Sequence, residues 1–87
     1  MALSVVFHKV ADYDEWRKVY DSVAELQTAG GVTQQSVHRL AGDPNAVLVL
    51  HYFGSVDEAR SFFANPDLLE AMKRGGVQGE PRIEYFE

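Results

Sequence analysis

The chain has 87 residues, of which 46% are hydrophobic and 11% aromatic, and its formal net charge at pH 7 is −5. This length fits one domain, residues 1–87, and this composition is too apolar for a disordered chain. The scattered basic residues argue against nucleic-acid binding, and the absence of cysteine excludes disulfides, zinc–thiolate sites and thiol catalysis.

Residues 3–10, LSVVFHKV, are rich in β-branched and aromatic side chains and predict the first strand. The apolar start lacks a basic region and a clear cleavage site, so we expect a strand there and no signal peptide. No apolar run is long enough to span a membrane. We therefore expect a cytoplasmic protein.

A helix is predicted to follow, with Asp12 as its N-cap. Gly30 and Gly31 end it, because glycine accepts the left-handed conformation that often closes a helix. Helical spacing relates its apolar residues, which are Trp16, Val19, Tyr20, Val23 and Leu26.

Residues 32–40 and 46–53 predict two further strands joined by the turn Gly-Asp-Pro-Asn. Ser55 and Glu58 form a capping-box pattern that predicts the start of the second helical segment. Asn65-Pro66 interrupts that segment, which then continues until Gly75-Gly76. Residues 82–86, RIEYF, predict the last strand.

The order of these elements is βαββαβ, which predicts a ferredoxin-like α+β fold. Right-handed crossovers place the third strand between the first and the second, in a four-stranded antiparallel sheet with both helices on one face. The third strand is apolar on both sides, whereas a half-exposed strand would alternate with polar residues. We therefore expect a second copy of the chain to cover the other face of the sheet.

Segments along nearly the whole chain resemble the dimeric α+β barrel superfamily: DYDEWRKVYD, AGGV, DPNAVLVLHYF, SVDEARSFF and LLEAMKRGGV. The likeness is greatest to its small antibiotic-biosynthesis-monooxygenase-like and polyketide-cyclase-like members. The resemblance implies a homodimer in which two sheets face each other, with a pocket between helices and sheet in each subunit. It also implies chemistry on aromatic polyketides without metal or flavin.

The resemblance does not carry over a catalytic residue. Monooxygenase members of this kind use Asn and Trp near the second helix and its preceding strand. This chain has Ser55, Phe62 and Phe63 there, and its only tryptophan, Trp16, lies on the first predicted helix.

His38 and His51 stand on either side of the predicted hairpin turn. With Pro44-Asn45 as the loop, the two histidines lie directly opposite each other on one sheet face. A shift of one residue would instead put them on opposite faces. His8 on the first strand could join them, and imidazoles in an apolar pocket can transfer protons near neutral pH. They could equally be an interface or pocket-rim pair, and without a carboxylate at matching spacing we expect no metal site.

Several large apolar side chains could bind a flat ligand. Trp16 and Tyr20 lie one helical turn apart and could stack on it, although aromatics at this spacing are more often core residues. The same two interpretations apply to Phe53, Phe62, Phe63 and Met72.

The resemblance implies a small cofactor-independent enzyme, a monooxygenase or cyclase, acting on a hydrophobic aromatic or polyketide-like molecule. His51, His38 and His8 are its proton-transfer candidates. The alternative is a non-catalytic ligand-binding or stress-associated dimer of the same fold. An RNA-binding domain of this strand order is disfavoured because the chain is acidic and its third strand lacks the basic-glycine-aromatic pattern.

Overall fold

A computed structural model describes all residues of the chain, 1–87. Its elements follow the order predicted from the sequence, with each of the two helical segments divided in two. They are β1 (Ala2–Val10), α1 (Tyr13–Ser22), α2 (Ala24–Ala29), β2 (Gln34–Leu40), β3 (Asp43–Phe53), α3 (Val56–Phe63), α4 (Pro66–Arg74) and β4 (Val77–Phe86). None of the helices is long and apolar enough to cross a membrane.

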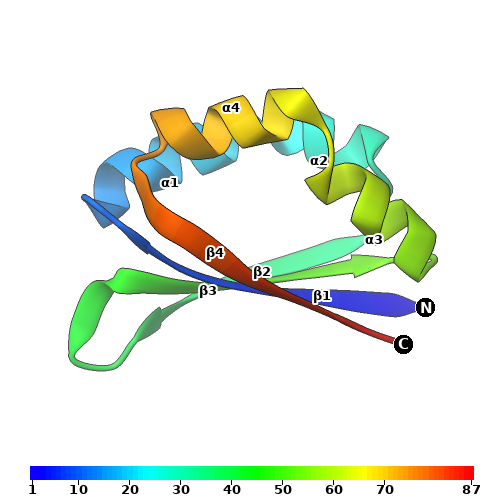
Figure 1. Cartoon of the computed structure of the whole chain (residues 1–87), viewed down its shortest axis with the longest axis horizontal. Helices are drawn as coiled ribbons and strands as arrows, with labels where there is room; N and C mark the ends of the chain where they lie inside the picture. The colour runs from blue at the N-terminus through cyan, green and yellow to red at the C-terminus, as the bar shows by residue number, and fades with distance from the viewer.

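The four strands form one antiparallel sheet in the order β2-β3-β1-β4, as the crossover rule predicts. All helices cover the same face of this sheet, and the chain ends lie side by side at one end of it (Figure 1). The ferredoxin-like α+β fold is therefore confirmed.

Polar side chains fix where the helices begin. Asp12 accepts hydrogen bonds from the backbone N–H groups of Asp14 and Glu15, and Ser55 accepts one from Glu58. Asn65 caps α4, in which proline occupies the first turn. These bonds satisfy donors that a helix start leaves without partners. The caps predicted at Asp12 and Ser55 are therefore confirmed.

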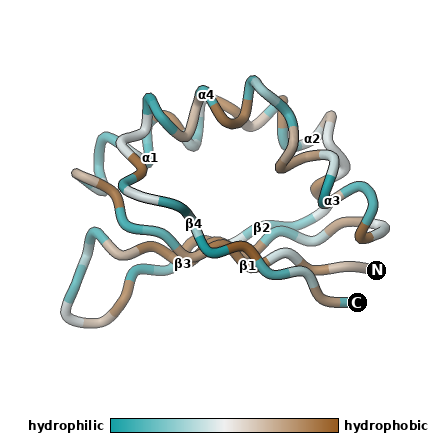
Figure 2. Tube along the Cα trace, in the orientation of Figure 1, coloured by the Kyte–Doolittle hydropathy of each residue, from teal (hydrophilic) through white to brown (hydrophobic).

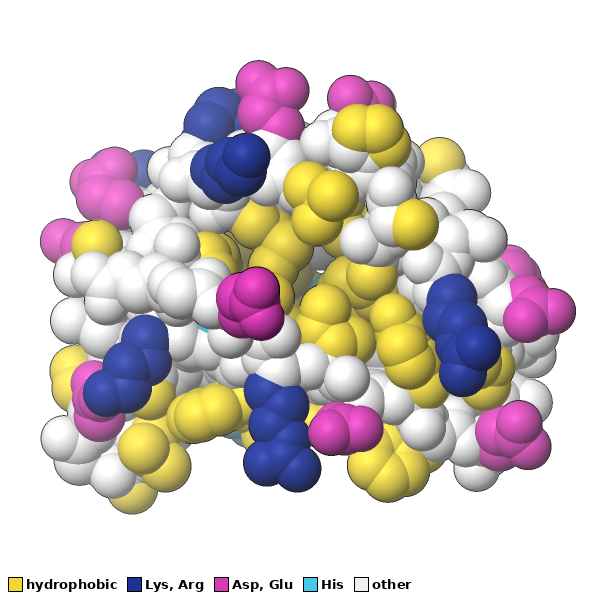
Figure 3. Space-filling model, viewed as in Figure 1, with side chains coloured by type: hydrophobic (Ala, Val, Ile, Leu, Met, Phe, Trp, Pro, Cys, Tyr) yellow, Lys and Arg dark blue, Asp and Glu magenta, His cyan; other side chains and the backbone are white.

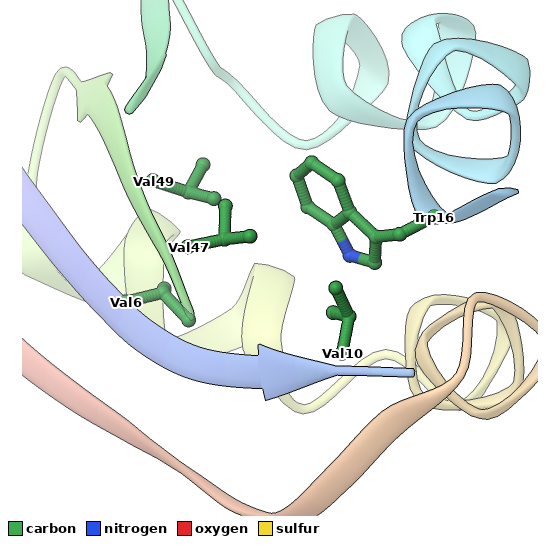
Figure 4. Packing of buried hydrophobic residues seen from close by; sticks show 5 residues of the cluster. All are labelled: Val6, Val10, Trp16, Val47 and Val49. Carbon is green, nitrogen blue, oxygen red and sulfur yellow. The ribbon is translucent and has the colours of Figure 1, made fainter. Parts of the chain in front are cut away.

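The face of the sheet that the helices cover holds the core. Trp16 reaches from α1 onto Val6, Val10, Val47 and Val49 of β1 and β3 (Figure 4). A second cluster consists of Phe53, Ala59, Phe62 and Leu68. Full burial of one such large side chain is worth roughly 1.5–3 kcal/mol. These two clusters therefore fix the helices on the sheet.

The other face of the sheet is not covered. Alternate residues of β1 and β3 point to it, and the hydrophobic ones are Leu3, Val5, Phe7, Leu48, Leu50 and Tyr52. Phe86 of β4 is 52% exposed and Phe7 is 37% exposed. The tube in Figure 2 is hydrophobic through the middle of β1 and β3, the two central strands of the sheet.

The hairpin between β2 and β3 differs from the prediction. Its turn is Ala41-Gly42, where Gly42 has a φ of +89°, and Pro44-Asn45 lies inside β3. The register shifts after the Arg39–Val47 pair, so that Leu40 pairs with Asp43. The predicted pairing of His38 with His51 is therefore wrong: His38 lies opposite Leu48, and His51 lies opposite Gln35.

Candidate functional site

A cavity lies between the sheet and helices α1 and α4, and its volume is about 50 Å³. Figure 3 shows a hollow on this side of the molecule, with hydrophobic side chains around it. Of its twelve lining residues ten are hydrophobic, and the two exceptions are His8 and His51. An apolar cavity with a few polar groups is the usual form of a small-molecule site.

His8, one of the two polar residues that line the cavity, has no hydrogen-bond partner. Its side chain comes from β1, is 5% exposed, and leaves both ring nitrogens without a partner. Its ring meets the edge of Trp16 at 5.6 Å between centroids. Burial lowers the pKa of His8, because it removes the water that stabilises the charged ring. His8 is therefore a neutral, unsatisfied polar group in an apolar wall.

His51 comes from β3 and is 4% exposed. Its Nε2 lies 3.0 Å from the hydroxyl of Tyr20, and its Nδ1 has no partner. Burial lowers the pKa of His51 to about 4. Burial also raises the pKa of Tyr20 to about 12, outweighing the opposite effect of the Gln27 side chain and Arg17. Both side chains are consequently neutral at pH 7.

Aromatic rings connect these two histidines across the cavity. Trp16 and Tyr20 are stacked with centroids 4.9 Å apart, as one turn of α1 between them predicts. Tyr20 is in turn nearly parallel to His51, at 6.0 Å. Phe63 tilts against His51 at 6.0 Å between centroids. These rings thus form a continuous aromatic row along the cavity.

The structure brings most of the candidate residues from the sequence to this cavity. Those that line it are His8, His51, Trp16, Tyr20, Phe63 and Met72. Phe53 is fully buried and Phe62 is 3% exposed, and both pack in the second core cluster. His38 is exposed on the uncovered face of the sheet, where its Nε2 lies 3.1 Å from the hydroxyl of Ser36. His38 and His51 thus point to opposite sides of the sheet.

Other lining residues were not singled out as site candidates. Val19 and Val23 share the helix face of Trp16 and Tyr20, and Leu68 and Ala71 share the α4 face of Met72. Helical spacing could have found all four. Gln35, which bonds the Tyr20 hydroxyl at 2.8 Å, could have been found only from the correct hairpin register.

No group of three or more His, Cys, Asp or Glu side chains is arranged to hold a metal ion. The cavity lining likewise has no Arg or Lys that could hold a phosphate or carboxylate. This arrangement suits a neutral, hydrophobic molecule. What it can do chemically is accept or donate a proton at an imidazole.

Comparison with known proteins found no matching family model and no matching curated protein. Solved structures do match over almost the whole chain. A protein from Bordetella bronchiseptica, named as an antibiotic biosynthesis monooxygenase, has a TM-score of 0.82 and 15% sequence identity, with 99% of this chain and 94% of that one covered. One from Caulobacter crescentus with the same description has a TM-score of 0.77 and 23% identity, with 98% and 86% covered.

A third similar structure is SnoaB, a cofactor-independent oxygenase from Streptomyces nogalater. Its TM-score is 0.80 at 16% identity, with 99% of this chain and 90% of that one covered. The chain has the fold of the antibiotic-biosynthesis-monooxygenase-like proteins. This confirms the predicted fold. A monooxygenase-like fold carries many activities, so any argument for function must come from the cavity.

Proposed function

We propose that the chain is a small cofactor-independent enzyme, of the oxygenase or cyclase type, acting on a hydrophobic aromatic or polyketide-like molecule in this cavity. One observation carries the proposal: the lining is hydrophobic except for two imidazoles, which together leave three buried nitrogens without a partner. Leaving a buried polar group unpaired costs about 1–3 kcal/mol. A bound molecule with hydroxyl or carbonyl groups would supply the missing partners.

His51 is the proposed proton acceptor. It is neutral at pH 7, so one of its two ring nitrogens has a lone pair that can take a proton from a bound phenol or an acidic C–H group. The burial that lowers its pKa also makes it a weak base in the empty cavity. The anion formed on the substrate would stay beside the imidazolium, and their attraction in apolar surroundings offsets part of that weakness. An aromatic carbanion can then react with O₂ directly.

The size of the cavity restricts how a ligand enters. A volume of about 50 Å³ holds a few water molecules, each of which needs at least roughly 10–15 Å³. A fused-ring ligand needs more space. Met72 is partly exposed at the cavity and is unbranched, so it can turn outward at little cost. We propose that Met72 moves aside when the ligand binds.

Anthrone is a suitable first probe, because it is flat and has an acidic C–H group. Its oxidation converts anthrone and O₂ into anthraquinone and water, with no other reductant. Trp16 is the only tryptophan and lies in the cavity wall, so quenching of its fluorescence reports binding. We expect quenching by anthrone, and faster O₂ uptake and anthraquinone formation than in a protein-free blank.

The matched variants are His51→Phe and His38→Phe. General base catalysis contributes typically about 10²–10⁴-fold, so His51→Phe should lose at least about a hundredfold in kcat. His38→Phe alters an exposed histidine on the other sheet face and should match the wild type. Equal turnover in all three proteins would contradict the proposal. Binding without turnover would favour the non-catalytic ligand-binding module instead.

We also propose that the chain forms a homodimer through the uncovered face of the sheet. The central strand β3 places Leu48, Leu50 and Tyr52 there without any cover from the helices. A chain of this length buries only about 60–65% of the surface of its unfolded form. A second copy would cover the patch without closing the cavity on the opposite face. The cytoplasmic location and the absence of a cofactor stay predictions from the sequence.

A further inference from the structure

A chain of hydrogen bonds runs from the surface of the molecule to the cavity. Gln35 lies on the edge strand β2, exposed, and pairs across the sheet with His51 on β3. Its Oε1 accepts the hydroxyl hydrogen of Tyr20 at 2.8 Å. The Tyr20 oxygen lies 3.0 Å from Nε2 of the buried His51. Three residues from α1, β2 and β3 therefore share one hydroxyl group.

With the Gln35 amide oriented as in the structure, one arrangement of the hydrogens satisfies both contacts of the Tyr20 hydroxyl. A hydroxyl has one hydrogen, and here the carbonyl oxygen of Gln35, which cannot donate, accepts it. In its contact with His51 the Tyr20 oxygen can then only accept, whether or not Gln27 also donates to it, so Nε2 must carry the hydrogen. A neutral imidazole has one N–H group, which leaves Nδ1 with a free lone pair. That nitrogen is buried and has no partner in the chain.

We propose that Gln35 and Tyr20 are positioning residues that hold His51 in its Nε2–H form, so that Nδ1 is the atom that accepts a hydrogen bond or proton from the ligand. Tyr20 also fixes the plane of the ring, because the two rings lie 13° from parallel. The catalytic consequence rests on the proposed function, whereas the hydrogen arrangement is a property of the free protein.

The side-chain amide of Gln35 decides between the two forms of His51. Rotated by half a turn, it would donate from its NH₂ group to Tyr20, and the Tyr20 hydroxyl would then donate to Nε2. His51 would carry its hydrogen on Nδ1 instead. Gln35→Glu presents only acceptor oxygens and should keep the Nε2–H form. Gln35→Leu and Tyr20→Phe remove the constraint and should give a mixture of both forms.

The decisive measurement is nitrogen NMR of the ligand-free protein labelled with ¹⁵N-histidine at pH 7. Long-range ¹H–¹⁵N correlations show which nitrogen of each ring carries the hydrogen, and His8→Phe and His38→Phe assign the three histidine signals. We expect the Nε2–H form of His51 in the wild type and in Gln35→Glu. A wild-type protein with hydrogen on Nδ1, or Gln35→Leu with pure Nε2–H, would overturn the proposal.

Anthrone oxidation provides the second readout. Loss of one net hydrogen bond corresponds to about a tenfold change in rate. Gln35→Leu should therefore lower kcat about tenfold and leave KM unchanged, because Gln35 does not line the cavity. An unchanged kcat in this variant counts against the positioning role. If the NMR result is as expected but the wild type does not turn over anthrone, the positioning stands and the proposed reaction falls.

Discussion

Two histidines with the same chemistry in the sequence have very different surroundings in the fold. His51 is 4% exposed among aromatic rings and has a lowered pKa, whereas His38 is exposed beside Ser36. A buried imidazole without full hydrogen bonding destabilises the fold, and such departures are expected mainly at functional or strained sites. That contrast supports His51 over His38 as the histidine of the proposed function.

The buried imidazole of His51 predicts a loss of stability in mild acid. Its pKa is about 4 in the folded chain and about 6.5 when unfolded, so the unfolded chain binds the proton more tightly. The free energy of unfolding should therefore fall as the pH drops from about 6.5 towards 4. The His51 contribution to this fall is about 3 kcal/mol. Its ring partner Tyr20 stays protonated throughout, because burial raises its pKa to about 12.

Urea unfolding at pH 7 and pH 4.5 measures this effect. His51→Phe removes the titrating group and should lose less stability between the two pH values than the wild type, by about 2–3 kcal/mol. The carboxylates and His8 are the same in both proteins, so their contributions to the pH dependence cancel in the comparison. His38→Phe serves as the exposed control and should behave like the wild type. Parallel losses in His51→Phe and wild type would contradict the lowered pKa.

At the scale of elements, periodicity and caps predicted the order of strands and helical segments. The position of the hairpin turn and the register of β2 on β3 depended on tertiary contacts. The sequence Ala-Gly-Asp-Pro-Asn contains two possible turns, Ala41-Gly42 and Pro44-Asn45. Asn45 lies in β3 and not in the turn. Its side chain accepts a hydrogen bond from the backbone N–H of Tyr13 at 2.9 Å, and the Asp43 side chain accepts one from the N–H of Asn45 at 3.1 Å. The first contact joins residues 32 apart in sequence, so local turn chemistry could not predict it. This contact explains why the register of β2 on β3 was predicted wrongly. Without that register, the contact of Gln35 with Tyr20 could not be predicted either.

The contribution of the Asn45 hydrogen bond to the free energy of unfolding can be measured. Its Oδ1 satisfies the first N–H of α1, which no residue within the helix can reach. We expect Asn45→Ala to lower the free energy of unfolding by about 1–2 kcal/mol, as loss of a helix N-cap does. Gln34→Ala, an exposed polar change at the start of β2, is the matched control and should have little effect. If both variants unfold at the same urea concentration as the wild type, the contact does not fix the hairpin.

At the scale of the whole molecule, the sheet separates two regions. Its covered face has the cavity and the core, and its uncovered face has a hydrophobic patch on β1 and β3. The two-sided apolar pattern of β3 predicted this division from sequence, because an antiparallel strand with one wet face would alternate with polar residues. Which face held each histidine could not be predicted, because that depended on the register of the hairpin.

The proposed dimer can be tested at the centre of that patch. Leu50 lies on β3 between its partners Val5 and Ser36, and Leu50→Glu would bury a charge in a sheet-to-sheet interface. We expect the wild type to sediment as a dimer at micromolar concentration and Leu50→Glu as a monomer of 9.7 kDa. Leu69→Glu, at an exposed leucine of α4 on the helical side, should remain dimeric. A monomeric wild type, or equal dissociation of both variants, would show that the patch is not the interface.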